Sequence, residues 1–313
     1  MKITILDSAT LGADMKFDMF EKLGETVVYH TTEKEQIADR IKYSDVVITN
    51  KMKLNEDNLK FACNLKLICV TATGFDNIDT GYCKKNGIAV CNVSGYSTNS
   101  VAQVTVSLAL SLACHLMEYD KYTKSGEYTK SGVANMLTPV YNELAGKTWG
   151  IIGMGNIGRQ VAKVAEAFGC RVIYTRQRAD ENACTLPELL KESDIISIHT
   201  PLTPETKGMI GKKELDMCTK KPILINVARG AVTDEEALTE AVIDGRLSGL
   251  GIDVYSVEPY GENHPYQKLM NHDNVILTPH MAWGAYESRA RLLDEIAENI
   301  KSFYGGGNKG RIV

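Results

Sequence analysis

The sequence predicts an α/β fold of two doubly wound parallel sheets, and three observations support this prediction. Short β-type runs alternate with helical patterns along most of the chain, which is typical of parallel βαβ units. Several of these runs are apolar throughout, as expected for strands that are covered on both faces. At 313 residues and 44% apolar composition, the chain is also longer than one ordinary core requires. We therefore expect two domains.

The strands of the first sheet lie in the first third of the chain. Four short runs have β-type composition, and they are Ile3–Leu6, Asp45–Thr49, Leu67–Thr71 and Ala89–Asn92. Polar residues cluster around Gly95 in the segment Ser94–Asn99. Such a cluster predicts a loop, so we expect the break between the two sheets there.

A long helix is predicted over Thr98–Glu118, directly after this break. Its residues are apolar on nearly every side, so the helix must be buried on several sides, by the second domain and by a second subunit. We expect it to contribute a homodimer contact. The stretch Val101–Met117 is interrupted by polar residues and is marginal in length for a bilayer, which predicts a buried helix and no membrane partner.

The second sheet draws on the rest of the chain. Six further runs have strand composition, and they are Thr148–Ile152, Arg171–Thr175, Ile195–His199, Ile223–Asn226, Leu250–Asp253 and Val275–Leu277. A final helix over about Ala285–Phe303 can return the chain to the first sheet. The predicted domains are residues 1–96 plus 286–313, and residues 97–285.

Charge and composition exclude several classes of function. The chain has 35 Lys and Arg against 39 Asp and Glu without long runs of one sign, so nucleic acid is not an expected partner. The N-terminus does not resemble a secretory signal. Eight scattered cysteines include no Cys-x-x-Cys pair, which predicts reduced thiols in the cytoplasm and no metal site.

A glycine-rich turn follows the predicted strand Thr148–Ile152 and precedes a helical pattern. Gly153 permits the tight turn, Gly155 lets a pyrophosphate approach the backbone, and Gly158 lets the helix pack closely on the strand. The helix N-terminus would face the phosphates. The alternative is a glycine-rich surface turn. The strand before and the helix after favour a dinucleotide-binding Rossmann domain.

The end of the next strand departs from the pattern that NAD requires. An acid normally binds the adenosine ribose there, whereas this sequence has Arg176 and Arg178 after Thr175. A guanidinium can pair with the 2′-phosphate of NADP. The sequence therefore leaves NAD and NADP both open as cofactors and favours NADP(H) from Arg176, unless the arginines are only a solvated strand end.

Further motifs appear in a fixed order along the chain. They are Thr71–Asp79, His199–Thr203, Asn226–Gly230, Asp253–Pro259 and Thr278–Trp283. Together with the glycine turn, they closely resemble the D-isomer-specific 2-hydroxyacid dehydrogenases, and most nearly the glycerate dehydrogenase and hydroxypyruvate or glyoxylate reductase type. The resemblance extends over nearly the whole chain. It implies a Rossmann nucleotide domain inserted in a flavodoxin-like substrate domain.

The resemblance assigns roles to three side chains that follow strands of the second sheet. Arg229 would bind the substrate carboxylate and C2 oxygen, Glu258 would pair with the histidine, and His280 would be the acid–base. Hydride reduction of a ketone builds negative charge on oxygen, which needs a proton donor that titrates near neutrality. A carboxylate on the other ring nitrogen favours the imidazolium, and the planar guanidinium matches a 2-oxo acid. Individually, each residue could instead be an ordinary loop or turn residue.

By the same resemblance, the first domain contacts the substrate and the second contacts the cofactor. The expected substrate-binding residues are Lys51, Ala72, Thr73 and Gly74. The expected cofactor-binding residues, besides the three glycines and Arg176, are Asn156, Ile157, Thr200, Pro201, Val227, Ala228, Asp253 and His280. A simple turn at Gly74 and a strand-end cap at Asp253 are the alternatives for those two.

The predicted function is hydride transfer between NAD(P)H and a small 2-oxo or 2-hydroxy acid. A different class is an NAD(H)-sensing binding protein that resembles the corepressors built on this fold, and formate and phosphite dehydrogenases share the architecture. The compact length and the lack of a basic surface favour the enzyme. The sequence leaves open which acid is used, in which direction, and the oligomeric state beyond a dimer.

Overall fold

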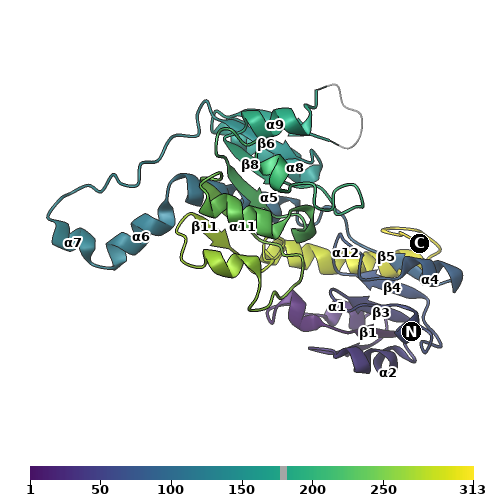
Figure 1. The fold of residues 1–313 in the computed structure, drawn as a ribbon. Coiled ribbons are helices and arrows are strands. Elements are labelled where there is room, and N and C mark those ends of the chain that lie inside the picture. The colour runs from purple at the N-terminus through teal and green to yellow at the C-terminus, as the bar shows by residue number, and fades with distance from the viewer. Residues whose placement is uncertain (177–181) are drawn as a thin grey trace. The chain divides into compact units, whose positions relative to one another are not determined.

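The structure is a computed structural model of the 313-residue chain, and it describes residues 1–176 and 182–313. Contacts between residues divide the chain into two units. Unit 1 comprises Met1–Ser97 and Gly284–Val313, and unit 2 comprises Thr98–Trp283. The boundaries expected from the sequence lie one to two residues away from these. The chain of unit 1 is thus interrupted by the whole of unit 2 (Figure 1).

Unit 1 contains a five-stranded sheet in the order β2-β1-β3-β4-β5, with every pair parallel. Its strands are β1 (Lys2–Ile5), β2 (Glu25–Val28), β3 (Val46–Thr49), β4 (Leu67–Val70) and β5 (Ala89–Cys91). Its α-helices are α1 (Asp18–Glu21), α2 (Ile37–Ile41), α3 (Glu56–Leu59), α4 (Thr80–Lys85) and α12 (Tyr286–Tyr304). The strand order is the flavodoxin-like one, as the resemblance implies.

Unit 2 contains a six-stranded parallel sheet in the order β11-β10-β9-β8-β6-β7. Its strands are β6 (Thr148–Ile152), β7 (Arg171–Thr175), β8 (Ile195–Ile198), β9 (Ile223–Asn226), β10 (Gly249–Ile252) and β11 (Val275–Leu277). The direction of strand addition reverses between β6 and β8. Such a switch point is where parallel sheets of this kind bind ligands, outside the carboxyl ends of the strands.

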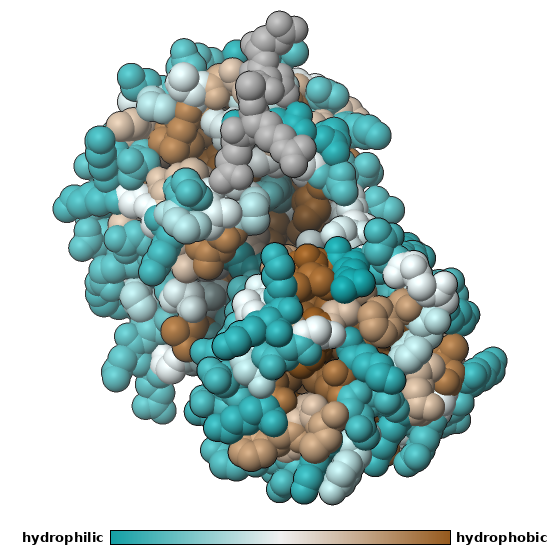
Figure 2. All heavy atoms as spheres, turned by 90° about the vertical axis from the view of Figure 1, so that its right-hand side faces the viewer, coloured by the Kyte–Doolittle hydropathy of each residue, from teal (hydrophilic) through white to brown (hydrophobic). Residues whose placement is uncertain are grey.

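Helices cover both faces of the unit 2 sheet. On one face, α5 (Thr98–Ala113) and α8 (Asn156–Ala167) contribute to a core with the buried Trp149. On the other face lie α9 (Leu186–Glu192), α10 (Lys212–Leu215) and α11 (Glu235–Ile243). Two sheets that are each covered by helices confirm the predicted fold class. The face of the molecule drawn in Figure 2 is mainly hydrophilic.

The predicted helix over Thr98–Glu118 is wrong in one respect, because the chain forms two helices there. The first is α5, and the second is α6 (Leu116–Lys124), which is followed by α7 (Glu127–Ser131). His115 adopts a left-handed conformation with φ 52° between them, and this ends the first helix. Of the helices in the described ranges, none alone meets the length and hydropathy of a bilayer span; α5 and α6 meet it only jointly, across a 63° bend.

The strand β2 was not expected from the sequence. It lies at the edge of the unit 1 sheet, and its residues Glu25–Val28 are exposed or half-buried. An edge strand of this length has too few buried side chains to produce an apolar run.

Candidate functional site

The glycine turn between β6 and α8 has the geometry that the sequence predicts. Gly153 has φ 101°, and a Cβ on it would lie 2.8 Å from the backbone of His199 and Thr200. A Cβ on Gly158 would lie 2.4 Å from the Gly153 carbonyl oxygen. These two glycines therefore permit the left-handed turn and the close packing of α8 on the strand.

The backbone at Gly155 is open, as close approach of a ligand to it requires. A Cβ built on this residue meets nothing within 4 Å among the described residues, and Gly155 provides no side-chain cap to α8. The first N–H groups of a helix have no partner within the helix, so those at Asn156 and Ile157 can bind phosphate oxygens. Arg159 adds a cation that donates to the Met154 carbonyl (3.2 Å) and to Asn156 Oδ1 (2.7 Å). Sequence reasoning missed Arg159, although it directly follows the third glycine.

Arg176 is exposed and directly follows β7. The carbonyl of the preceding residue, Thr175, accepts a hydrogen bond from Gly153 (3.1 Å). The arginine thus lies at the carboxyl end of the strand beside the glycine turn, where the ribose-binding residue is expected. Arg178 lies outside the described residues.

The segment after β8 contains a buried imidazole. His199 Nε2 lies 3.0 Å from Ser197 Oγ, which also accepts from Trp149 Nε1 (3.0 Å). Burial lowers the pKa of His199 to about 3, so the ring is neutral. The neighbouring Thr200 is buried as well, and the carbonyl of Pro201 accepts from Thr206.

The turn that bears Arg229 is held by a buried asparagine. The side chain of Asn226, at the end of β9, accepts from the Ala228 N–H (3.0 Å) and donates to the Arg229 carbonyl (3.0 Å). Val227 within this turn is buried. Arg229 Nη1 donates to the Ala228 carbonyl (2.8 Å), and no carboxylate pairs with the guanidinium among residues 1–176 and 182–313. It is therefore available to an acidic ligand.

Gly230 brings the next loop against this turn. A Cβ on Gly230 would lie 2.0 Å from the Tyr255 carbonyl carbon and 2.2 Å from the Ser256 nitrogen. Backbone atoms cannot yield to such a clash, so only glycine fits here. The loop after β10 is consequently packed directly beside Arg229.

The side chains of His280 and Glu258 are in contact beyond the carboxyl ends of β11 and β10. Nδ1 of His280 lies 2.6 Å from Glu258 Oε2, and the two side chains are 24% and 27% exposed. The other oxygen of Glu258 accepts from the Tyr255 N–H (3.1 Å). The carboxylate thus orients the imidazole in a place that a substrate can reach.

Asp253 holds the turn on which His280 lies. Its carboxylate accepts from the Thr278 hydroxyl (2.6 Å) and from the N–H groups of Met281 and Ala282 (2.9 Å each). Burial raises the pKa of Asp253, although these hydrogen bonds oppose the shift. His280 itself has φ 52°, a strained conformation for a residue with a Cβ. The predicted contact of Asp253 with a nicotinamide amide stays a prediction.

In unit 1, a buried aspartate organises the loop that bears Lys51. The Asp7 carboxylate, at the end of β1, accepts from the backbone N–H groups of Asn50 (3.0 Å) and Lys51 (2.7 Å). Burial raises the pKa of Asp7, and these hydrogen bonds again oppose the shift. Asn77 donates to the Asn50 and Met52 carbonyls from the other side. Sequence reasoning missed Asp7, although it directly follows the first strand.

The segment Ala72–Gly74 follows β4 at the same edge of the unit 1 sheet. The Thr73 hydroxyl donates to the Val93 carbonyl (2.9 Å), and Asn92 donates to the Thr73 carbonyl (2.6 Å). Two buried polar atoms at this edge, Asn50 Nδ2 after β3 and Thr71 Oγ1 after β4, have no hydrogen-bond partner within the described part of the chain. Such atoms are costly to bury, and a polar ligand would satisfy them.

No cluster of three or more His, Cys, Asp or Glu side chains suited to a metal ion occurs among the described residues.

Comparison with known proteins identifies the family. The model of the D-isomer specific 2-hydroxyacid dehydrogenase NAD binding domain matches residues 106–282. The chain is 36% identical over 309 residues to a glycerate dehydrogenase of Methylorubrum extorquens, covering 97% of this chain and 96% of the relative. Further relatives are named hydroxypyruvate reductase and glyoxylate reductase.

Two solved structures are similar over the whole chain. A D-lactate dehydrogenase from Aquifex aeolicus, complexed with NAD and lactic acid, has a TM-score of 0.85 and 32% identity, with 98% of this chain and 96% of that chain covered. An acyclic imino acid reductase in complex with NADPH and D-Arg has a TM-score of 0.86 and 29% identity, with both chains fully covered. The chain therefore belongs to the D-isomer-specific 2-hydroxyacid dehydrogenases, and it is an oxidoreductase that acts between a nicotinamide cofactor and a small 2-oxo or 2-hydroxy acid.

Proposed function

We propose that His280 is the proton donor when the enzyme reduces a 2-oxo acid to the D-2-hydroxy acid. The observation that supports this role best is the 2.6 Å contact between His280 Nδ1 and Glu258 Oε2. Glu258 accepts from Nδ1, so in the protonated ring the second proton, at Nε2, is the one that passes to the substrate oxygen. Glu258 also keeps the ring in one orientation.

The nicotinamide, when bound, supplies or accepts the hydride. The glycine turn and the N-terminus of α8 hold its pyrophosphate, with Gly153, Gly155 and Gly158 providing the space. We propose that the cofactor is also contacted by Asn156, Ile157, Thr200, Pro201, Val227, Ala228, Asp253 and His280.

Arg229 binds the carboxylate and C2 oxygen of the substrate. Its side chain has no internal acid among the described residues, and its planar fork matches a carboxylate. The guanidinium also stabilises the charge that develops on the C2 oxygen. In unit 1, the backbone of Ala72, Thr73 and Gly74 holds the substrate carboxylate, and Lys51 contacts the rest of the substrate. The unpaired Asn50 and Thr71 atoms support a polar ligand there.

Hydroxypyruvate and glyoxylate are the first substrates to test, since relatives bear those names. The experiment is an absorbance assay of reduced nicotinamide consumption with hydroxypyruvate, glyoxylate, pyruvate and phenylpyruvate, each with NADH and with NADPH. We expect clear turnover of at least one small 2-oxo acid. Cofactor binding without turnover of any acid would contradict this function and favour an NAD(H)-sensing binding protein.

NADPH is the preferred reductant by the same proposal. Arg176 lies where an acid would bind the ribose of NAD, and a guanidinium there attracts a 2′-phosphate. A structural neighbour bound to NADPH shows that relatives of this fold use that cofactor. The enzyme would work in the cytoplasm, where NAD(H) and NADP(H) are both available.

The functional form is proposed to be a homodimer. The contact expected from the sequence was the helix near residues 98–118, but α5 is largely buried within unit 2. The exposed apolar side chains lie just beyond it, and they include Leu116, Met117, Val133, Leu137 and Val140. We name residues 116–141 the arm, and Figure 1 shows its helices α6 and α7 beyond the end of α5. A second copy of this chain is the occupant that best explains so apolar an arm.

A further inference from the structure

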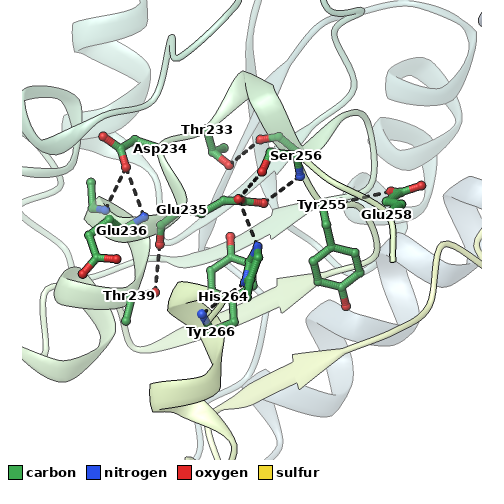
Figure 3. A network of polar contacts seen from close by, with 12 residues as sticks. Thr233, Asp234, Glu235, Glu236, Thr239, Tyr255, Ser256, Glu258, His264 and Tyr266 are labelled. Carbon is green, nitrogen blue, oxygen red and sulfur yellow. Dashed lines mark hydrogen bonds and ion pairs between the residues drawn. The ribbon is translucent and has the colours of Figure 1, made fainter. Parts of the chain in front are cut away.

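Glu235 lies at the start of α11, and its carboxylate is buried although no substrate role falls on it. The side chain is only 10% exposed. Removing a carboxylate from water is costly unless several donors satisfy it. Three donors do so here: the backbone N–H and the hydroxyl of Ser256, and Nε2 of His264 at 3.1 Å. Figure 3 shows Glu235 between these partners.

The histidine in this network acts as a neutral donor. Its Nδ1 accepts from the backbone N–H of Tyr266 (3.3 Å), so the ring proton is on Nε2 and points to Glu235. The His264 side chain is 8% exposed and packs on the rings of Tyr255, Tyr260 and Tyr266. The Glu235 carboxylate is therefore held in one position by these partners.

Stabilisation of α11 does not explain this arrangement. Asp234 already caps the helix, since its carboxylate accepts from the N–H groups of Glu236 and Ala237 (3.1 Å each). Glu236 points to the surface and pairs with Lys268 (2.6 Å). Glu235 alone of these three acids reaches the loop after β10, as Figure 3 shows.

That loop presents Glu258 to His280. Ser256, which Glu235 holds by two hydrogen bonds, lies two residues before Glu258. The Tyr255 N–H donates to Glu258 Oε1 (3.1 Å), and the Tyr255 hydroxyl donates to the Thr278 carbonyl (2.9 Å), close to His280 in sequence. Gly230 packs against the Tyr255–Ser256 peptide from the side of Arg229.

We infer that Glu235 is a positioning residue, which fixes the loop Tyr255–Glu258 and so sets the distance of Glu258 from His280. The inference rests on the proposed roles of Glu258 and His280. Charged groups near the His280 ring include Glu258 and, from the end of β10, Asp253. Glu235 acts on the ring only through the first of these.

The test is an NMR titration of the His280 ring signals, because it does not depend on turnover. The chain has six histidines, so the His280 signal is assigned as the one missing from the spectrum of His280→Ala. In Glu235→Gln, the amide presents N–H groups to donors, the loop loosens and Glu258 moves from the ring. The titration midpoint should fall by about 0.5 pH unit or more, and kcat should fall about tenfold while the KM for the cofactor stays unchanged.

Two neighbouring acids provide matched controls. Glu236→Gln removes an ion pair between the same helix and the segment of residues 265–269, without touching Ser256. Asp234→Ala removes the helix cap and lowers stability. Both should leave the His280 midpoint unchanged. If Glu235→Gln does not fold, Ser256→Ala removes one donor to Glu235 and should shift the midpoint in the same direction by less.

A double-mutant comparison excludes a direct effect of the Glu235 charge. In a Glu258→Gln background, the further change Glu235→Gln should not move the His280 midpoint, because the group through which it acts is already lost. An unchanged midpoint in Glu235→Gln, an equal shift in Glu236→Gln, or an additive shift in the double variant would overturn the inference. Normal turnover by His280→Ala would instead refute the proposed acid–base role, and the titration would still decide whether Glu235 positions the pair.

Discussion

Arg229 shows how a single side chain can be prepared for a substrate by its neighbours. Asn226 clamps the turn on both sides, and Gly230 lets the loop of Glu258 lie against it. The guanidinium is half-buried and faces no internal acid among the described residues. A half-buried binding group in such a turn has little freedom to adjust, so its shape matters as well as its charge.

The change Arg229→Lys should therefore abolish most of the activity although it keeps the charge. We expect kcat/KM for the 2-oxo acid to fall about 10²-fold or more, with the KM for the cofactor unchanged. Steady-state kinetics measure this, and Arg246→Lys, a surface ion-pair change in the same unit, is the control. Retention of most activity by Arg229→Lys would mean that charge alone is sufficient.

Residues of the site differ in how far the sequence revealed them. Arg229, Glu258 and His280 follow predicted strands inside motifs, so their positions could be predicted. Glu235 and His264 are 29 positions apart in the chain, and nothing in the sequence alone pairs them. Asp7 was missed for the same reason, since its partners lie beyond position 48. Contacts between distant segments depend on packing, which periodicity does not report.

At the level of elements, the strands of the sequence analysis were predicted well and the helix ends less so. Parallel strands buried on both faces produce apolar runs, so the ten expected strands occur within about a residue of their predicted ends. The break at His115 was not predicted, because neither Gly nor Pro marks it. A left-handed histidine replaces the usual glycine there.

We propose that the residue after β7 decides the choice of cofactor. Wild-type enzyme should prefer NADPH over NADH by about 5- to 150-fold in kcat/KM if Arg176 pairs with the 2′-phosphate as proposed. Arg176→Asp should reverse this preference, since an aspartate binds ribose hydroxyls and repels the phosphate. The measurement is kcat/KM with both reduced cofactors at low and high salt, since screening should weaken the NADPH advantage.

The control for this change lies on the same strand. Arg171, at the opposite end of β7, forms an ion pair with Glu192, and Arg171→Gln should leave the cofactor preference unchanged. A clear preference of the wild-type enzyme for NADH would show that Arg176 does not bind the cofactor. Arg178, outside the described residues, should then be tested by the same substitution.

At the scale of the whole molecule, the arm of residues 116–141 exposes apolar side chains that no contact within the described part of a single chain covers. Leu137 and Val140 are 74% and 75% exposed, which is unusual for two apolar side chains so close in the sequence. The double change Leu137→Glu with Val140→Glu should convert the dimer to a monomer, as measured by sedimentation velocity. Ile243→Glu, at an exposed apolar position on α11, should leave the dimer intact. A monomeric wild-type protein, or a dimeric double variant, would contradict the proposed interface.

We propose that this dehydrogenase uses His280, oriented by Glu258, to protonate the oxygen of a 2-oxo acid. The most direct measurement is kcat of His280→Ala for the best acid of the substrate panel, together with the cofactor Kd from nicotinamide fluorescence. We predict a fall in kcat of about 10²–10⁴-fold with a nearly unchanged Kd, since proton transfer is lost and the cofactor contacts remain. Near-normal turnover by His280→Ala would contradict the claim.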